Sequence, residues 1–115
     1  MINAKFSLFV AFLPSLIGSA FAVCAGSTFA IGNQQVLGPA GDATVSRWSV
    51  YAGNCNEVDG LTTTENPCTS GTFGCSPPPI FFDSYTSSFT GETFSCSRDG
   101  ASESCGSDQI SVCCR

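Results

Sequence analysis

The chain has 115 residues, eight of them cysteine, no histidine, and nine acidic against four basic side chains, for a formal net charge of −5. This acidity argues against nucleic acid, heparin and anionic membranes as partners, because each of them attracts positive charge. Since histidine is absent, Ser-His-Asp and Cys-His catalysis are excluded.

The first 22 residues are predicted to be a secretory signal peptide. Lys5 gives the N-terminal region its positive charge, residues 6–17 are mainly apolar, and Ala20-Phe21-Ala22 matches a small-x-small cleavage site. The apolar run is too short to span a bilayer, so no membrane insertion is expected. Residues 23–115 are then expected to form a single secreted, extracellular domain, with three arginines, nine carboxylates and hence a net charge of −6.

All the cysteines lie in this mature domain, and an even number in an exported chain predicts four disulfides. Their spacing contains no Cys-x2-4-Cys zinc knuckle, so neither a metal nor any other cofactor is expected. The eight predicted disulfide cysteines are Cys24, Cys55, Cys68, Cys75, Cys96, Cys105, Cys113 and Cys114.

The first part of the mature domain alternates between predicted strands and loops. Residues 23–31 are predicted to be a strand, whereas residues 33–42 are predicted to be a loop because they contain a Gly-Pro pair and a further glycine. Residues 46–52 (SRWSVYA) alternate as a strand does, with Trp48 and Val50 on one face.

A hairpin is predicted to follow this strand. Gly53-Asn54 forms the turn, residues 55–58 return beside the strand, and Asp59-Gly60 turns the chain again. Residues 61–79 show no strand period and are predicted to be irregular.

Three further strands are predicted in the second half, at residues 80–83, 93–97 and 109–114. The last of these alternates, so Ile110, Val112 and Cys114 should face inward. The predicted fold class is therefore small, disulfide-rich and mainly β, an antiparallel sheet with long irregular loops and four disulfides.

The terminal cysteine pair predicts two bonds to two different segments. A direct Cys113–Cys114 bond is disfavoured, because consecutive Cα atoms lie about 3.8 Å apart, closer than the usual disulfide span. Cys24 is a candidate partner of either one. Elsewhere, Cys68 and Cys75 are close enough to bond locally. Cys96 and Cys105 resemble a hairpin pair, although a turn at residues 99–100 would not place them opposite each other.

A proline-aromatic stretch is the candidate binding surface. Three prolines favour an extended polyproline segment, and aromatic side chains suited to recognition follow it. The alternative is a rigid crossover into a core strand, in which either Phe81 or Phe82 is buried. The residues of the candidate surface are Pro77, Pro78, Pro79, Phe81 and Tyr85.

No catalytic residue is predicted, and three other functional hypotheses remain as alternatives. Asp83 is the candidate acid of a small carboxylate-dependent glycoside hydrolase, although scattered carboxylates also keep exported proteins soluble. The Cys68–Cys75 loop could display Phe73 as a protease inhibitor does. Trp48 and Tyr51 could stack on a sugar, but Trp48 is assigned to the core because it shares its face with an apolar neighbour.

The segments LTTTENPCTSGTFGCSPPPI (residues 61–80) and ISVCCR (residues 110–115) resemble the small secreted cysteine-rich proteins of filamentous, particularly mushroom-forming, fungi. The resemblance implies an extracellular setting and assigns no site residues. The expected function is therefore that of a secreted, non-enzymatic, effector-like or defence-related protein. We expect it to be monomeric and to bind an extracellular protein or glycan.

Overall fold

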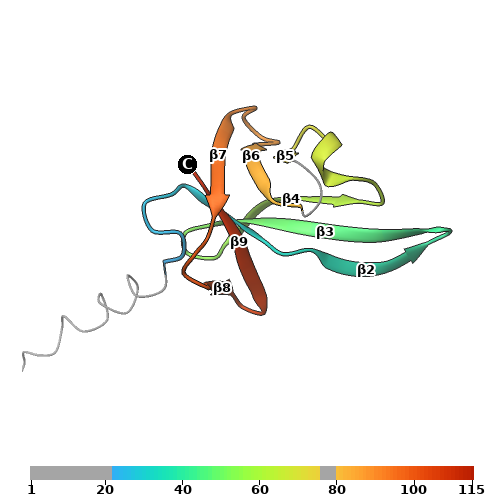
Figure 1. Cartoon of the computed structure of the whole chain (residues 1–115), viewed down its shortest axis with the longest axis horizontal. Coiled ribbons are helices and arrows are strands. Elements are labelled where there is room, and N and C mark those ends of the chain that lie inside the picture. Colours follow the sequence, from blue (N-terminus) through green and yellow to red (C-terminus); the bar gives the residue numbers. More distant parts are fainter. Residues whose placement is uncertain (1–21, 76–79) are drawn as a thin grey trace, which may run out of the picture.

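The computed structural model describes residues 22–75 and 80–115, and within them the chain forms nine strands and one short 3-10 helix, η1 (Figure 1). The strands form one antiparallel sheet in the order β2-β3-β1-β9-β7-β6-β5, with β4 also paired to β3 and β8 to β9. The predicted mainly β, disulfide-rich class is confirmed. The elements are β1 (Phe29–Gly32), β2 (Gln35–Ala40), β3 (Ala43–Ala52), β4 (Glu57–Thr63), η1 (Pro67–Thr69), β5 (Phe73–Cys75), β6 (Phe82–Thr86), β7 (Thr93–Arg98), β8 (Ser104–Cys105) and β9 (Asp108–Cys114).

Strand β3 is the centre of the fold, because it pairs with β1, β2 and β4. Its alternation is as predicted: Trp48 and Val50 face the main core, while Tyr51 faces a second cluster on the opposite side. The main core comprises Ile31, Trp48, Val50, Phe73, Phe82, Tyr85, Val112 and Cys114. The second cluster comprises Val23, Cys24, Ala30, Tyr51, Cys105 and Ile110.

The predicted β3–β4 hairpin is confirmed, but the turn predicted at Asp59-Gly60 is wrong. Both residues lie within β4, opposite Val50 and Ser49. A Cβ at position 60 would overlap the guanidinium of Arg47, which crosses β4, so glycine lets the arginine lie against the strand without shifting. The glycine therefore serves close packing across the hairpin rather than chain reversal.

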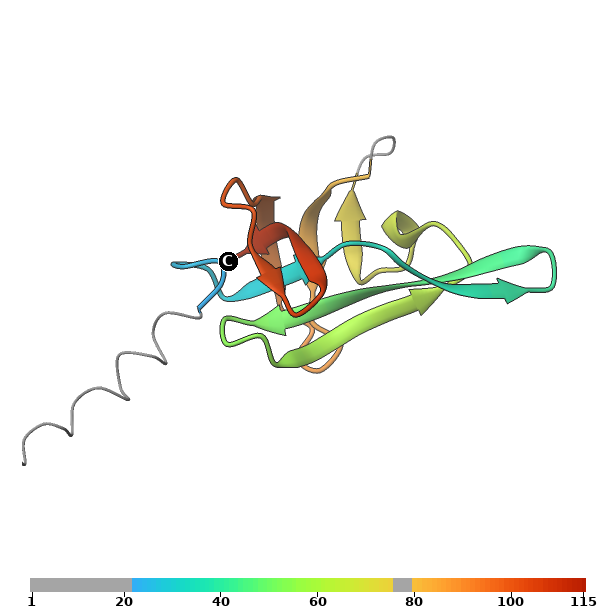
Figure 2. The same cartoon turned by 90° about the horizontal axis from the view of Figure 1, so that it is seen from below.

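The loop predicted at residues 33–42 is also wrong, because most of it forms β2. This strand and β3 project together as a long hairpin (Figures 1 and 2). β2 pairs only with β3 and so lies at a sheet edge, where a proline's missing N–H is tolerated. Gly38 has a φ of 133° and lies beside a β-bulge, so the two residues that suggested a loop are accommodated within an edge strand.

The remaining predicted strands are largely confirmed, with shifted ends. The first begins at Phe29 rather than at residue 23, and that predicted at 80–83 runs instead from Phe82 to Thr86. The strands predicted at 93–97 and 109–114 are β7 and β9. The irregular segment predicted at 61–79 contains the end of β4, η1 and β5. Within the described part of the chain, no helix has the length and hydrophobicity needed to cross a bilayer.

Strand β9 carries a bulge that overturns one predicted face. Ile31 lies opposite Val112 and the next residue, Gly32, lies opposite Ile110, so Ser111 is an extra residue in β9. One extra residue places the side chains on its two sides out of step, so that they no longer alternate between the faces of the sheet. Consequently Val112 is in the main core as predicted, but Ile110 packs in the second cluster.

Four disulfides are present, as predicted, and the two terminal cysteines bond to separate segments. The Cys68–Cys75 bond is local as expected, and Cys24 does bond to the terminal pair. The alternative Cys96–Cys105 bond is wrong, because β7 pairs with β9 and so places Cys96 opposite Cys114. The four bonds are Cys24–Cys113, Cys55–Cys105, Cys68–Cys75 and Cys96–Cys114.

Candidate functional site

The structure does not assemble the predicted proline-aromatic surface. Pro77, Pro78 and Pro79 lie outside the described residues. Phe81 is half-buried, with the guanidinium carbon of Arg98 4.1 Å from its ring centroid. Tyr85 is only 1% exposed, so its assignment to a binding surface is wrong.

The burial of Tyr85 has a local cause. Gly74 on β5 pairs with Ser84 but the next residue, Cys75, pairs with Phe82, so Asp83 is an extra residue in β6. This bulge places Phe82 and Tyr85 on the same, inward side although they are three residues apart. Phe82 is thus the buried member of the Phe81-Phe82 pair.

A pocket of about 400 Å³ opens beside these residues, and we call it the Trp48 pocket. It lies between the β1–β2 link, β3, the start of β6 and the β9 bulge. Its volume is within the range of small-molecule sites. The described residues that line it are Gly32, Asn33, Gln34, Trp48, Ile80, Phe82 and Ser111.

Aromatic and aliphatic side chains form the apolar part of the pocket. Trp48 is 7% exposed and packs edge-on against Phe82, with 6.0 Å between ring centroids. Ile80 is 40% exposed and adds an aliphatic surface. The assignment of Trp48 to the core is therefore confirmed, and its remaining exposed edge contributes to the pocket.

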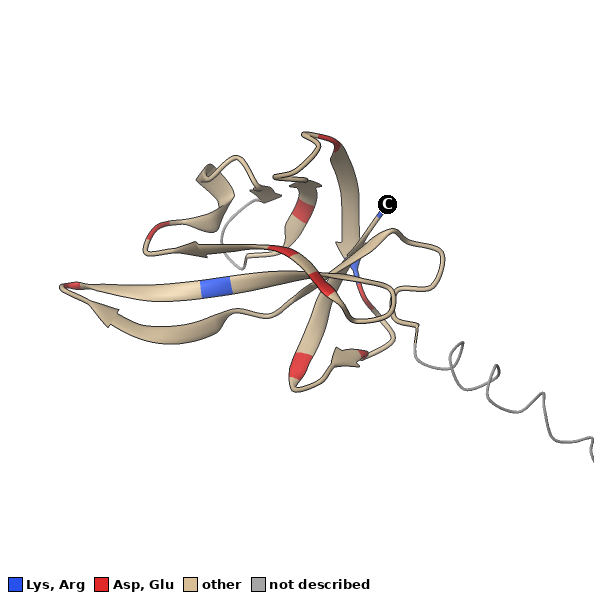
Figure 3. Ribbon diagram, turned by 180° about the vertical axis from the view of Figure 1, so that it is seen from behind, with Lys and Arg blue, Asp and Glu red and all other residues tan. Residues whose placement is uncertain are grey.

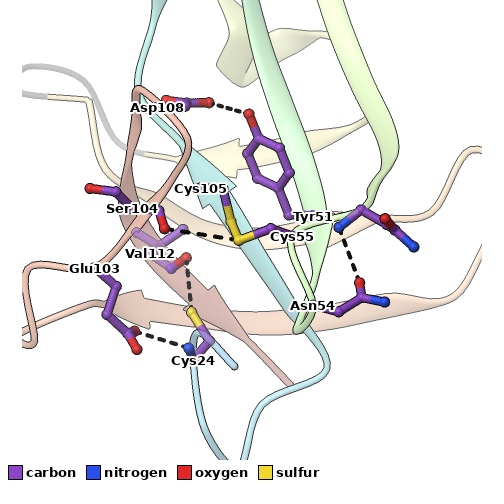
Figure 4. The surroundings of a disulfide bond; sticks show 10 residues. Cys24, Tyr51, Asn54, Cys55, Glu103, Ser104, Cys105, Asp108 and Val112 are labelled. Atoms are coloured by element: carbon purple, nitrogen blue, oxygen red, sulfur yellow. Dashed lines mark hydrogen bonds between the residues drawn. A yellow bond between two sulfur atoms is a disulfide. The ribbon is translucent and has the colours of Figure 1, made fainter. Parts of the chain in front are cut away.

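Two residues with amide side chains form the polar rim, and hydrogen bonds hold the backbone of Asn33 and the side chain of Gln34. Asn33 donates its backbone N–H to Asp108 Oδ1 at 2.9 Å, and Gln34 donates from Nε2 to Ser46 Oγ at 2.8 Å. The other oxygen of Asp108 accepts the Tyr51 hydroxyl at 2.7 Å (Figure 4). The Asn33 backbone is therefore fixed to β9 and the Gln34 side chain to β3.

Gly32 and Ser111 complete the pocket at the β1–β9 bulge. A Cβ at Gly32 would overlap the Asp108 carboxylate, so only glycine lets this acid reach both of its partners. The bulge turns Ser111, the extra residue of β9, into the pocket lining. Sequence analysis missed Gly32, Asn33, Gln34 and Ser111, since the pairing that brings them together is long-range.

The lining of the Trp48 pocket combines polar and apolar groups. Its lining offers amide and hydroxyl groups, which donate and accept hydrogen bonds, beside apolar surface. None of its described lining residues carries a carboxylate, an amine or a thiol that could act as a general acid, base or nucleophile. Figure 3 shows the acidic residues distributed over many strands and loops rather than gathered at one place.

A second pocket, of about 440 Å³, lies along β4 and contains two carboxylates that are already engaged. Glu57 forms an ion pair with Arg47. Asp59 accepts hydrogen bonds from the Tyr85 hydroxyl at 2.5 Å and from Ser88 Oγ at 2.7 Å. Burial alone would raise the pKa of Asp59, but these hydrogen bonds lower it, so the group stays ionised rather than serving as an acid.

Neither alternative activity gains support from these positions. The two pockets do not supply the free carboxylate pair that a glycosidase uses, and Asp83 is exposed on β6 away from their linings. The local Cys68–Cys75 bond is present, but Phe73 is 2% exposed and stacks on Phe82 at 4.2 Å. Phe73 is therefore not displayed to a protease, which overturns that form of the inhibitor hypothesis.

One cluster has the composition of a metal site but not its chemistry. Ligand atoms of Cys24, Asp99, Glu103 and Cys113 lie within 4.8 Å of one another. The two sulfurs are bonded to each other and so cannot act as thiolate ligands. Glu103 also accepts the backbone N–H of Cys24 at 2.9 Å, so this cluster fastens the start of the domain to the β7–β8 connection.

Both tyrosines of the chain should resist ionisation in the folded protein. Burial and the hydrogen bond to Asp108 raise the pKa of Tyr51 to about 12, and burial and the bond to Asp59 raise the pKa of Tyr85 further. Because the folded pKa values lie above the unfolded value of about 10, this contribution to stability is present below pH 10 and is lost as the pH rises through the folded values. At pH 11 we expect little tyrosinate absorbance from folded protein and extensive ionisation in denaturant; a folded-state midpoint near pH 10 would contradict the two tyrosine–aspartate bonds.

Comparisons with models of protein families, with curated proteins and with solved structures found no match. The candidate site is the Trp48 pocket, whose described lining is uncharged and in which hydrogen bonds to β9 and β3 hold Asn33 and Gln34.

Proposed function

We propose that this is a secreted, non-enzymatic binding protein, effector-like or defence-related, that captures an extracellular glycan or protein group in the Trp48 pocket. The observation that carries the proposal is the fixed rim of this pocket. Asn33 and Gln34 are exposed, yet bonds to Asp108 and Ser46 hold their segment in place. A site ordered in advance loses less entropy on binding, which favours recognition.

An extracellular location agrees with the covalent structure. Four disulfides persist in oxidising compartments and are rare in the reducing cytosol. The signal peptide predicted at residues 1–22 would deliver the chain to such a compartment. The setting and the pocket together support a role in binding outside the cell.

Filling the pocket should abolish binding. We expect Gln34→Tyr to reduce binding at least tenfold, because the larger side chain occupies the mouth of the pocket while position 34 is exposed enough to tolerate it. The measurement compares purified wild type and variant on a panel of immobilised extracellular polysaccharides and cell-surface proteins.

Val36→Tyr is the matched control. Val36 is 65% exposed and lies two residues along the same hairpin, but it does not line the pocket. This variant should bind as the wild type does. Equal binding by wild type and Gln34→Tyr, or equal losses in both variants, would refute the assignment of the pocket.

A further inference from the structure

We infer that the Trp48 pocket takes an uncharged sugar ring, so that the ligand class is a neutral saccharide. This inference rests on the proposed function and narrows it. Three features of the described lining carry it: the lack of charge, the combination of amide and hydroxyl groups with apolar surface, and the limited size of the pocket.

The first feature is electrostatic. None of the described lining residues is charged, and the nearest acid of the rim, Asp108, has one oxygen on Tyr51 and the other on Asn33. A uronic acid or a sulfated sugar would find no cation in this lining. The net negative charge of the chain would also repel it.

The second feature is the pairing of polar and apolar groups. A neutral pyranose presents hydroxyls around its edge and C–H groups on its faces. The amides of Asn33 and Gln34 and the hydroxyl of Ser111 both donate and accept hydrogen bonds, as sugar hydroxyls require. Ile80, which is 40% exposed, supplies apolar contact for the C–H groups, and the largely buried Trp48 also lines the pocket.

Gln34 has a specific part in this arrangement. Its amide nitrogen already donates to Ser46, which fixes the side chain. Among the described residues nothing donates to its carbonyl oxygen, so that oxygen is the acceptor offered to a ligand hydroxyl. Losing one such hydrogen bond should weaken binding about tenfold.

The third feature is size. A stable protein interface spreads over about 800 Å² per partner, whereas this pocket is a local hollow of about 400 Å³ lined by few residues. The same volume lies within the usual range for small ligands. A sugar ring of an extracellular glycan therefore suits the pocket better than a protein surface does.

Trp48 is the only tryptophan of the chain, so its fluorescence reports directly on the pocket. Purified protein would be titrated with neutral tetrasaccharides of glucose, mannose and N-acetylglucosamine, and with tetragalacturonic acid as the anionic probe. We expect a saturable change with at least one neutral probe and none with the anionic probe. Gln34→Ala should raise the dissociation constant about tenfold, whereas Gln109→Ala, an exposed glutamine outside the pocket, should leave it unchanged.

The outcomes separate this inference from the proposed function. If Gln34→Tyr abolishes capture of a cell-surface protein while no neutral saccharide alters Trp48 emission, the saccharide inference is wrong and the proposed binding role stands. A response to the anionic probe alone also overturns the inference. If a neutral saccharide binds equally to wild type, Gln34→Ala and Gln34→Tyr, the Trp48 pocket is not the site and both proposals fail.

Discussion

Gly32→Ala should lower the free energy of unfolding by about 2–4 kcal/mol and disable the Trp48 pocket. The new Cβ would occupy the position of the Asp108 carboxylate, which is 5% exposed. Asp108 would then have to release the Tyr51 hydroxyl and the Asn33 N–H, and the phenol would be left buried without its partner. Denaturant unfolding measures the loss, and Trp48 fluorescence measures the loss of binding.

Gly53→Ala is the control for this substitution. A Cβ at position 53 would meet only the Val23 carbonyl oxygen, at an ordinary 3.7 Å. Its effect should stay within about 0.5 kcal/mol. If Gly32→Ala were equally mild, Asp108 would not be held against Gly32 as the structure has it.

Removing the Cys24–Cys113 bond by a double serine substitution should cost about 4 kcal/mol. This bond joins residues 89 positions apart, so breaking it frees both ends of the domain in the unfolded state while the other three bonds remain. Breaking it also removes the covalent link between Cys24 and β9. Cys24 belongs to the second cluster, part of which is drawn in Figure 4. Equilibrium unfolding of the double variant, with the other bonds verified by mass spectrometry, measures the effect.

The Cys68–Cys75 double serine variant provides the comparison. Its cysteines are only 7 positions apart, so the same reasoning gives a loss of about 2 kcal/mol. The long-range bond should therefore matter more than the local one. A loss from the local variant that equals or exceeds that of the long-range variant would contradict this order.

The sequence was sufficient where the determining information is local. Alternation along residues 46–52 identified both faces of β3, and the doublet at Cys113 and Cys114 identified a strand fastened to two segments. The short spacing of Cys68 and Cys75 identified their bond. In each of these cases neighbouring residues decide the geometry.

Bulges and strand pairing explain what the sequence did not reveal. An extra residue at Ser111 moves Ile110 to the other face, and one at Asp83 turns Tyr85 inward. β2 becomes a strand because β3 pairs with it, in spite of its Gly-Pro pair. The register of a strand against its partner depends on residues far along the chain. The alternation of apolar and polar residues within one strand does not encode it.

The candidate site was hidden for the same reason. Its residues come from four separate segments, and only the β1–β9 pairing places Ser111 near Gly32. Ile80 and Phe82 come from the proline-aromatic stretch that the sequence did mark, but the other three segments have no unusual composition. Trp48 and Tyr51 were considered for sugar contact in advance; only Trp48 lines the pocket, and its spacing correctly assigned it to the core.

The most direct test of binding at the Trp48 pocket is a titration followed by the proton–nitrogen NMR spectrum of 15N-labelled protein. The ligand is the neutral tetrasaccharide that changes Trp48 fluorescence most. The expected result is that shift changes concentrate at the amides of residues 32–34, at the Trp48 indole and at Ser111. Changes concentrated instead around Val58 and Phe89, in the second pocket, or no changes at saturating saccharide, would contradict the account.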